Sequence, residues 1–217
     1  MKLEINIDKK TAVVSNSKEL YVKKFFFNNN KFKNEIEGYL WYFKKKINVT
    51  KKKNVTCLNL PYLSGYQIKF WRSITKNKKE ILQVLKHYKK FWPINKKKKV
   101  PFHGDLTFSN IIFNDQQKLR FIDWEDFKKK EVWGLDICYF LLSVLILPAL
   151  SRKKKNIFNE EYIVFKDFWD FFFLKNNFKF LKDPINYLKT KKLNRNFFLK
   201  KINKKILSEI NSILKKK

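Results

Sequence analysis

Four residue types that often define a class of protein are scarce in this chain. Its 217 residues include 4 glycines, 5 prolines, 2 cysteines and 2 histidines. Cys57 and Cys138 stand alone in apolar stretches, so we expect two buried thiols and neither a disulfide scaffold nor a cysteine-rich metal site. Hydrophobic residues make up 44% of the chain, which is enough for a packed core and argues against wholesale disorder.

Acidic residues are few as well, and lysine supplies nearly all of the resulting positive charge. The chain has 50 basic and 19 acidic residues, for a formal net charge of +31. Its few arginines are Arg72, Arg120, Arg152 and Arg195. Proteins that read bases depend on the bidentate guanidinium of arginine, so this composition argues against specific binding to nucleic acid. The positive charge still favours ligands that carry phosphate and permits peripheral contact with anionic surfaces.

No apolar run in the sequence has the length of a membrane span. The most apolar stretch, 135–150, is short for this purpose and contains Asp136 and Pro148, so it predicts a buried helix over 135–147. The N-terminal stretch MKLEINIDKK has no apolar core of the kind found in signal peptides. We therefore expect a cytoplasmic protein without a transmembrane segment.

The first part of the chain has the alternating pattern of β-strands. Apolar and polar residues alternate in three short segments, 2–7, 11–17 and 19–27. Short strands with tight connections predict a small antiparallel sheet. A further apolar stretch, 54–68, is interrupted by a proline and a glycine, and we interpret it as a strand that ends in a linker near 61–66.

Two helices are predicted within the first half of the chain. The first is expected over 34–46, where Ile36, Leu40 and Phe43 recur on one side with helical spacing. The second is expected over 68–91 and stops before a proline. These helices flank the predicted linker.

The second half of the chain combines a hairpin with helices. Strands are predicted over 110–113 and 119–124, joined by a turn at 114–118. From residue 160 to the end the pattern predicts two or three amphipathic helices rich in phenylalanine and lysine. With the small sheet and the buried helix, this pattern indicates an α+β fold.

The stretch FHGDLTFSNIIF, residues 102–113, brings polar side chains together around the predicted hairpin. Asp105 lies in a loop that enters a strand, and Asn110 follows five residues later. Asp123 ends the partner strand, so the hairpin places it near Asn110. Oxygen ligands of this kind suit Mg²⁺, which takes one or two carboxylates and completes its shell with phosphates and water. A nearby carboxylate can also orient or deprotonate a hydroxyl.

The residues HGDLTFSNIIF, FIDWEDF and GLD, in this order, resemble the aminoglycoside phosphotransferase and choline kinase family, the small-molecule relatives of protein kinases. Gly104 stands where protein kinases have arginine, and DWE stands where they have D-F-G. The resemblance implies a protein-kinase-like, two-lobed fold. Residues 1–63 would form an abbreviated, β-rich N-lobe, and residues 64–217 a mostly helical C-lobe that carries the catalytic loop.

The resemblance also implies a role for each residue of the motif. Asp105 would accept the proton of the acceptor hydroxyl or orient it. Asn110 and Asp123 would hold Mg²⁺, with Glu125 as a further metal ligand or else a solvated carboxylate of the turn. The supports of the catalytic loop would be His103 and Asp136.

Family members also hold the nucleotide phosphates with a strand lysine that pairs with a helix glutamate. Lys23 follows an apolar triplet as the family lysine does, and Glu35 is its favoured partner. Lys24, on the opposite face of the strand, and Glu37 are the alternatives. The first turn, within NIDKKTA, has no glycine that would let the backbone close over phosphates, although its lysines could supply charge.

The sequence thus predicts a phosphotransferase that uses ATP or GTP with Mg²⁺ and phosphorylates a hydroxyl of a small molecule, a sugar or a cell-envelope glycan. The lysine-rich C-terminal part favours a neutral or anionic acceptor over a cationic one. Because the glycine-rich loop is missing, a catalytically silent nucleotide-binding module is an alternative. A basic nucleic-acid-binding protein is the less favoured one.

Overall fold

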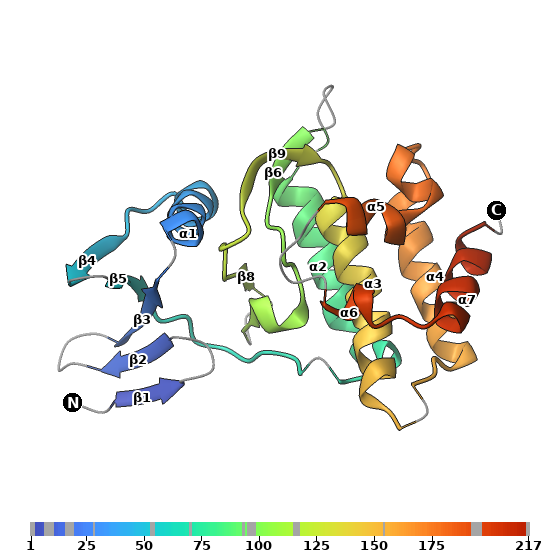
Figure 1. The fold of residues 1–217 in the computed structure, drawn as a ribbon, viewed down its shortest axis with the longest axis horizontal. Helices are drawn as coiled ribbons and strands as arrows, with labels where there is room; N and C mark the ends of the chain where they lie inside the picture. The colour runs from blue at the N-terminus through green and yellow to red at the C-terminus, as the bar shows by residue number, and fades with distance from the viewer. Residues whose placement is uncertain are drawn as a thin grey trace.

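The structure of the protein is a computed structural model that describes residues 3–6, 11–15, 20–27, 29–52, 55–69, 71–92, 94, 99–114, 118–153, 155–191 and 197–215. A five-stranded sheet and helix α1 lie at one end of the molecule, and the other helices lie at the opposite end (Figure 1). Two small two-stranded sheets lie between them. This mixture of helices and separate small sheets confirms the expected α+β class.

The sheet contains the strands β1 (Leu3–Asn6), β2 (Thr11–Ser15), β3 (Leu20–Phe26), β4 (Asn48–Lys52) and β5 (Val55–Pro61). All neighbours pair antiparallel, in the order β1-β2-β3-β5-β4. The three predicted N-terminal strands and the strand that leads into the linker are confirmed. Strand β4 was not predicted, because its sequence, NVTKK, lacks a run of alternating apolar residues.

Helix α1 (Asn29–Phe43) follows β3 directly, but it buries a different face from the one predicted. Its buried residues are Glu35, Gly38, Tyr39 and Tyr42, whereas Leu40 is 39% exposed. The predicted helix is confirmed, but of Ile36, Leu40 and Phe43, which share one side, the first and last are half-buried and Leu40 is exposed. Aromatic rings and a glycine fill the buried side, so the amphipathic pattern of the helix is weak.

Two antiparallel two-stranded sheets lie between the five-stranded sheet and the helices, and one of them is a hairpin. The pair β7 (Ile111–Phe113) and β8 (Leu119–Phe121) confirms the predicted hairpin, although its turn includes residues 115–117, which lie outside the described residues. The pair β6 (Lys99–Phe102) and β9 (Lys128–Val132) was not predicted, and its register shifts between Val100 and Phe102.

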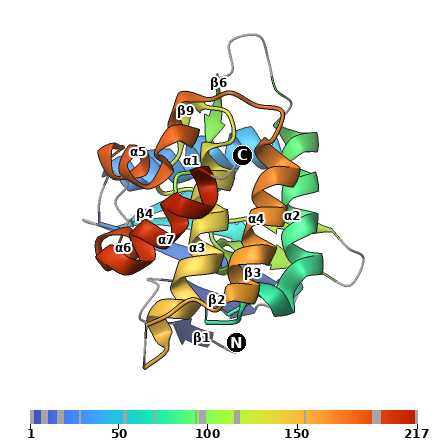
Figure 2. The ribbon, with the colours of Figure 1, turned by 90° about the vertical axis from the view of Figure 1, so that its right-hand side faces the viewer.

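The helical part begins with the 3-10 turn η2 (Ile74–Asn77) and helix α2 (Lys78–Phe91). It continues through α3 (Leu135–Ser151), α4 (Asn159–Phe173), η4 (Lys179–Lys182), α5 (Pro184–Thr190), α6 (Phe197–Lys200) and α7 (Lys204–Lys215). Helices α2, α3 and α4 run side by side (Figure 2), while α6 packs against α3 and α7 packs against α4.

Two predicted helix boundaries and the predicted number of C-terminal helices need correction. The helix expected over 68–91 begins only at Lys78, since residues 71–73 form a turn and Ser73 caps η2 through its hydroxyl. Among the described residues of the C-terminal region, the structure has four α-helices where two or three were predicted, because short polar segments break the amphipathic pattern. Helix α3 passes Pro148 and ends at Ser151, because a proline in the last turn removes only one hydrogen bond.

Helix α3 is the centre of the hydrophobic core. Every residue from Leu135 to Ala149 is buried, including Asp136 and Ser143. A helix that is apolar all round belongs either in the core of a protein or in a membrane. In the part of the chain that the structure describes, no helix combines the length and the apolar character needed to cross a membrane.

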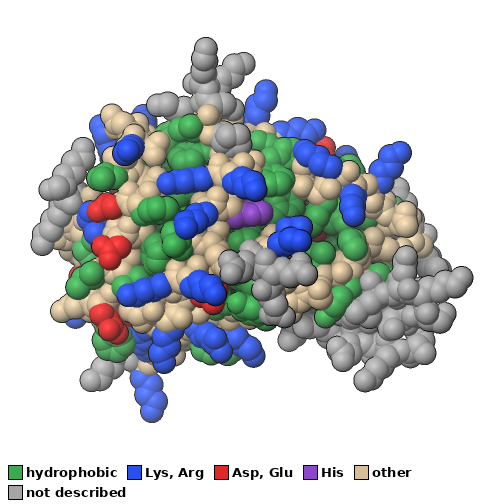
Figure 3. Space-filling model, turned by 180° about the vertical axis from the view of Figure 1, so that it is seen from behind, with side chains coloured by type: hydrophobic (Ala, Val, Ile, Leu, Met, Phe, Trp, Pro, Cys, Tyr) green, Lys and Arg blue, Asp and Glu red, His purple; other side chains and the backbone are tan. Residues whose placement is uncertain are grey.

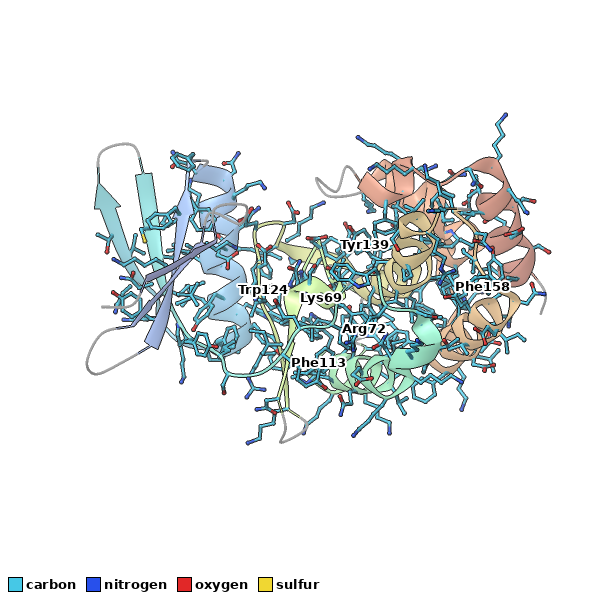
Figure 4. All side chains as sticks on the ribbon, turned by 90° about the horizontal axis from the view of Figure 1, so that it is seen from below. Lys69, Arg72, Phe113, Trp124, Tyr139 and Phe158 are labelled. Carbon is cyan, nitrogen blue, oxygen red and sulfur yellow. The ribbon has the colours of Figure 1, made fainter. Side chains whose placement is uncertain are left out.

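An aromatic cluster joins α1 to the two small sheets, and Trp124 lies at its centre (Figure 4). The indole of Trp124 is fully buried, with the rings of Tyr42 and His103 at centroid distances of 5.1 and 4.5 Å. Gly38 of α1 packs directly on it, since a Cβ atom at this glycine would lie 2.5 Å from the Cβ atom of Trp124. Only a residue without a side chain permits this approach of α1.

We predict that Gly38→Ala destabilises the protein by about 2 kcal/mol, because the added methyl group overpacks this contact. Helix propensity alone would predict the opposite, a stabilisation of about 1 kcal/mol. Urea unfolding measures the difference. The control is Lys33→Ala at an exposed position of the same helix, which we expect to change stability by less than about 0.5 kcal/mol. An unchanged or more stable Gly38→Ala variant would contradict the packing argument.

A buried carboxylate holds the ends of α3, α4 and η2 together. Glu161 is 1% exposed and accepts hydrogen bonds from the Ser73 hydroxyl at 2.7 Å and the Phe158 amide at 3.0 Å. Both terminal nitrogens of Arg152 also donate to it. Burial opposes ionisation, but these donors together lower the pKa of Glu161. Glu161 is therefore a buried anion whose four donors come from three elements.

Glu161→Gln is expected to lower the free energy of unfolding by about 3 kcal/mol, because it leaves the guanidinium of Arg152 without its charged partner. The neighbouring Glu160 is exposed, so Glu160→Gln is a matched control and should cost less than about 0.5 kcal/mol. Chemical denaturation at neutral pH compares the two variants. Equal stability of both would show that the Glu161 network does not hold these helix ends.

Candidate active site

A cavity of about 610 Å³ lies between the sheet, α1 and the hairpin β7–β8. Its apolar walls include Val22, Tyr39, Leu60, Ile112 and Ile122. Its polar lining includes Lys24, Lys31, Glu35, Asn110, Asp123 and Glu125. A cavity with apolar walls and a few converging charges is the usual form of a binding site for a small molecule or cofactor.

The ammonium group of Lys24 lies among three carboxylates of this cavity. Its Nζ atom lies 2.9 Å from Glu35 Oε2, 2.7 Å from Asp123 Oδ1 and 3.2 Å from Glu125 Oε1. Burial alone would lower the pKa of Lys24, but the carboxylates outweigh it and raise the pKa. For the Glu35 carboxyl, burial has the opposite effect and raises the pKa, while the nearby Lys24 ammonium acts against this rise. Lys24 is therefore a permanently charged group in the cavity.

Lys23, which the sequence favoured for this position, does not take it. Successive residues of β3 point to opposite faces of the sheet, and the face with Val22 and Lys24 lines the cavity. Lys23 lies instead over the ring of Tyr21, with Nζ 5.8 Å from the ring centroid. The preference for Lys23 is corrected to Lys24.

The choice between the two glutamates of α1 agrees with the sequence analysis. Glu35 is 1% exposed and binds Lys24, whereas Glu37 is exposed and forms a surface ion pair with Lys129 at 3.1 Å. The pair Lys24–Glu35 joins β3 to α1.

Asp123 and Glu125 reach the cavity from the segment that follows β8. Asp123 has a φ of 65°, in the left-handed region that is costly for a residue other than glycine. Trp124 between them is buried beneath α1, so both neighbouring carboxylates face the cavity. The first two turns of α1 contact this segment, since Lys31 Nζ lies 2.9 Å from Glu125 Oε2 and the Asn34 amide donates to the Glu125 carbonyl.

The carboxylate of Asp105 is held by two donors. Asn110 Nδ2 donates to Asp105 Oδ2 at 2.9 Å and to the Asp105 carbonyl at 2.7 Å. The hydroxyl of Tyr139, which Figure 4 labels on α3, donates to Asp105 Oδ1 at 3.1 Å. Asn110 in turn lines the cavity. Since its NH₂ group faces Asp105, the side-chain oxygen of Asn110 is free to face elsewhere.

His103 and Asp136 support the loop that carries Asp105. The two carboxylate oxygens of Asp136 accept the backbone N–H groups of His103 at 2.9 Å and of Gly104 at 3.1 Å. Burial raises the pKa of Asp136 to about 7, and the two N–H donors act against this rise. Nδ1 of His103 accepts from the Asp105 amide, so the proton lies on Nε2, which donates to the Ile122 carbonyl.

Gly104 allows the loop to approach the segment after Trp124. Its φ is 90°, and a Cβ atom there would lie 2.4 Å from the Asp126 carbonyl oxygen. Any side chain would therefore both strain the backbone of this residue and collide with the backbone of Asp126. The glycine that replaces the kinase arginine has a packing reason in this structure.

The oxygen atoms around the cavity fit a magnesium ion bound together with phosphate. Asp123 and Glu125 offer carboxylates, and Asn110 offers its amide oxygen. Among the residues that the structure describes, no three His, Cys, Asp or Glu side chains gather closely enough to hold a metal by themselves. Mg²⁺ at nucleotide sites needs no such cluster, because one or two protein oxygens suffice when phosphates and water complete the shell.

Several residues of the site were not anticipated. Tyr139 lies three residues after Asp136, hence on the same side of a helix, and this spacing was a usable signal. Lys31, Asn34 and Gly38 carry no such signal, because their roles follow from where α1 packs. Lys24 could not be chosen over Lys23, since both faces of β3 carry large apolar residues.

Comparison with known proteins finds a match to the central part of the chain. A family model described as "Phosphotransferase enzyme family" matches residues 59–131. No curated protein matches the chain significantly. The matched segment extends from β5 to β9 and includes Asp105, Asn110 and Asp123. It confirms the resemblance to the aminoglycoside phosphotransferase and choline kinase family there, and it supports an enzyme of the kinase type. Lys24 and Glu35 lie outside it.

We predict that Lys24→Met lowers the free energy of unfolding at pH 8 by about 3 kcal/mol, because it leaves Glu35 buried without a counterion. The pKa of Glu35 would then rise further above its unfolded value, so folding would favour its protonated form. Stability would fall as pH increases through this window, and the difference from wild type should be smaller at pH 5 than at pH 8.

Lys23→Met is the matched control for this prediction. It removes the same charge one residue away, from a position without an ion pair among the described residues, and should change stability by less than about 0.5 kcal/mol at either pH. Denaturant unfolding at pH 5 and pH 8 tests both variants. Equal losses in the two variants would contradict the central position given to Lys24.

Proposed function

We propose that the protein is an ATP-dependent phosphotransferase that phosphorylates a hydroxyl of a small molecule, a sugar or a cell-envelope glycan. One observation carries this proposal. Lys24, Glu35, Asn110 and Asp123 line one cavity, and Asp105 adjoins it through its hydrogen bond to Asn110. A cation, oxygen ligands for a metal and a carboxylate that can orient a hydroxyl are the parts that phosphoryl transfer requires.

Lys24 would bind the phosphates nearest the nucleoside, with Glu35 holding its ammonium group in place. Asn110 and Asp123 would hold Mg²⁺, with Glu125 as a third oxygen ligand. Bound Mg²⁺ would supply positive charge to the transferring phosphoryl group. The left-handed backbone of Asp123 supports this role, because strain at such a position is commonly kept where a site needs a particular orientation.

Asp105 would orient the acceptor hydroxyl for in-line attack and accept its proton. The donors Asn110 and Tyr139 hold the Asp105 carboxylate in one position, so this group would need little reorientation when the acceptor binds. His103 has both ring nitrogens in hydrogen bonds to the backbone, which supports a structural role and not proton transfer.

The base of the nucleotide would lie against the segment after β5. Pro61, Tyr62 and Leu63 line the cavity there, opposite the apolar side chains of Val22 and Ile122. Leu63 lies just after the end of β5, so its backbone amide is not used by the sheet. We place the boundary of the two kinase-like lobes at this segment, with residues 1–63 as the N-lobe and 64–217 as the C-lobe.

The acceptor is proposed to be neutral or anionic. Lysine and arginine side chains are spread over the face seen in Figure 3, and acidic ones are few there. Such a surface repels cationic acceptors and attracts phosphate-bearing ones, and it is also compatible with peripheral contact with anionic surfaces. We place the enzyme in the cytoplasm, where ATP is abundant.

The test is transfer of the γ-phosphate from ATP or GTP to a panel of sugars, sugar phosphates, amino alcohols and glycans. We expect transfer to a neutral or anionic acceptor, and a loss of at least about 100-fold in kcat for Asp105→Asn with nucleotide affinity unchanged. Glu37→Gln, which alters an exposed carboxylate, is the control and should retain full activity.

Other outcomes assign the protein differently. Nucleotide binding that Asp123→Asn weakens, without transfer to any acceptor, would identify a silent nucleotide-binding module. Transfer to choline alone would contradict the proposed acceptor class. Absence of both nucleotide binding and transfer would reject the kinase function.

A further inference from the structure

We propose that Lys31 is a second phosphate-binding cation of this site and takes over the part of the absent glycine-rich loop. This inference rests on the proposed nucleotide-binding function. Lys31 lines the same cavity as Lys24, Asp123 and Glu125, and it belongs to the first turn of α1. Its side chain is 33% exposed, compared with 8% for Lys24, so it lies nearer the mouth of the cavity.

The two lysines already share one anionic group. Lys24 Nζ lies 3.2 Å from Glu125 Oε1, and Lys31 Nζ lies 2.9 Å from Glu125 Oε2. A carboxylate and a phosphate both present negatively charged oxygens on a single central atom. Two ammonium groups that flank one carboxylate can therefore flank a phosphate group in the same way.

The site would need such a cation because the sequence before α1 has no glycine-rich stretch. In related phosphate sites, glycine-rich turns direct several N–H groups at the ligand. The first turn of this chain reads Asn6-Ile7-Asp8-Lys9-Lys10 and has no glycine. Lys9 and Lys10 lie outside the described residues, whereas Lys31 is placed in the cavity wall.

Lys31 can also change partner at little cost. Its ion pair with Glu125 is partly exposed, and pairs of this kind contribute little free energy. The second turn of α1 contacts the same segment, since Asn34 donates to the Glu125 carbonyl at 2.9 Å. Glu125 thus holds Lys31 beside the cavity, and a nucleotide phosphate would replace Glu125 as its partner.

The experiment measures the affinity of the full chain for ATP, ADP and adenosine, each with Mg²⁺, by isothermal titration. We expect Lys31→Met to weaken ATP binding by about tenfold or more, since a charge-assisted hydrogen bond is lost, and to leave adenosine binding unchanged. Adenosine binding at the same time reports that the variant is folded. Lys31→Arg, which keeps the charge, should restore most of the ATP affinity.

Two controls separate this role from general charge. Lys33→Met removes the same charge from an exposed position of α1 and should leave ATP affinity unchanged. The double variant Lys9→Met/Lys10→Met tests the two lysines between the first two predicted strands. If ATP affinity falls in the double variant and not in Lys31→Met, the phosphate cation lies in the first turn and the inference is overturned.

The remaining outcomes are also decisive. ATP affinity equal to wild type in Lys31→Met, or an equal loss for adenosine, would overturn the role of Lys31 and leave the proposed function standing. Failure of the wild-type chain to bind ATP, ADP and adenosine would overturn the proposed function and this inference together.

Discussion

The ammonium group of Lys24 is the interaction on which the arrangement of the site depends. It belongs to the sheet, Glu35 belongs to α1, and Asp123 and Glu125 belong to the segment after β8. A buried cation without these carboxylates, or a buried Glu35 without the cation, would be strongly unfavourable. The three structural parts are therefore located relative to one another by charge, while the close approach of Gly38 to Trp124 sets how near α1 comes.

The central part of the site could be predicted because its residues are close in sequence or joined by a single hairpin. The loop with Asp105 and Asn110 leads directly into β7, and the pairing of β7 with β8 brings Asp123 to the same end. The resemblance to a known family also predicted that His103 and Asp136 support this loop. Asp136 accepts hydrogen bonds from the loop backbone, in agreement with this expectation. The roles of these residues in catalysis are still proposals.

The choice of Lys24 over Lys23, and of the buried face of α1, could not be predicted in the same way. Both depend on which side of β3 the helix covers. Because both faces of that strand carry apolar residues, the sequence does not indicate which face is covered. The strands β4 and β9 read NVTKK and KKKEV, and backbone pairing with a neighbour holds them without an apolar pattern of their own. A chain with 50 basic residues places lysine even where a strand or a helix start would usually carry another residue.

The hydrogen bonds of Asp136 have a consequence for the motions of the loop that carries Asp105. A loop is usually free to fluctuate, since its backbone groups bond to water or to nearby side chains. Here the amides of His103 and Gly104 bond to a carboxylate in the first turn of α3, the most deeply buried helix of the molecule. For this loop to open locally, a buried carboxylate would have to lose both of its backbone donors. In dynamic terms the loop therefore belongs to the most stable cooperative unit of the fold, although it lies at the edge of a cavity.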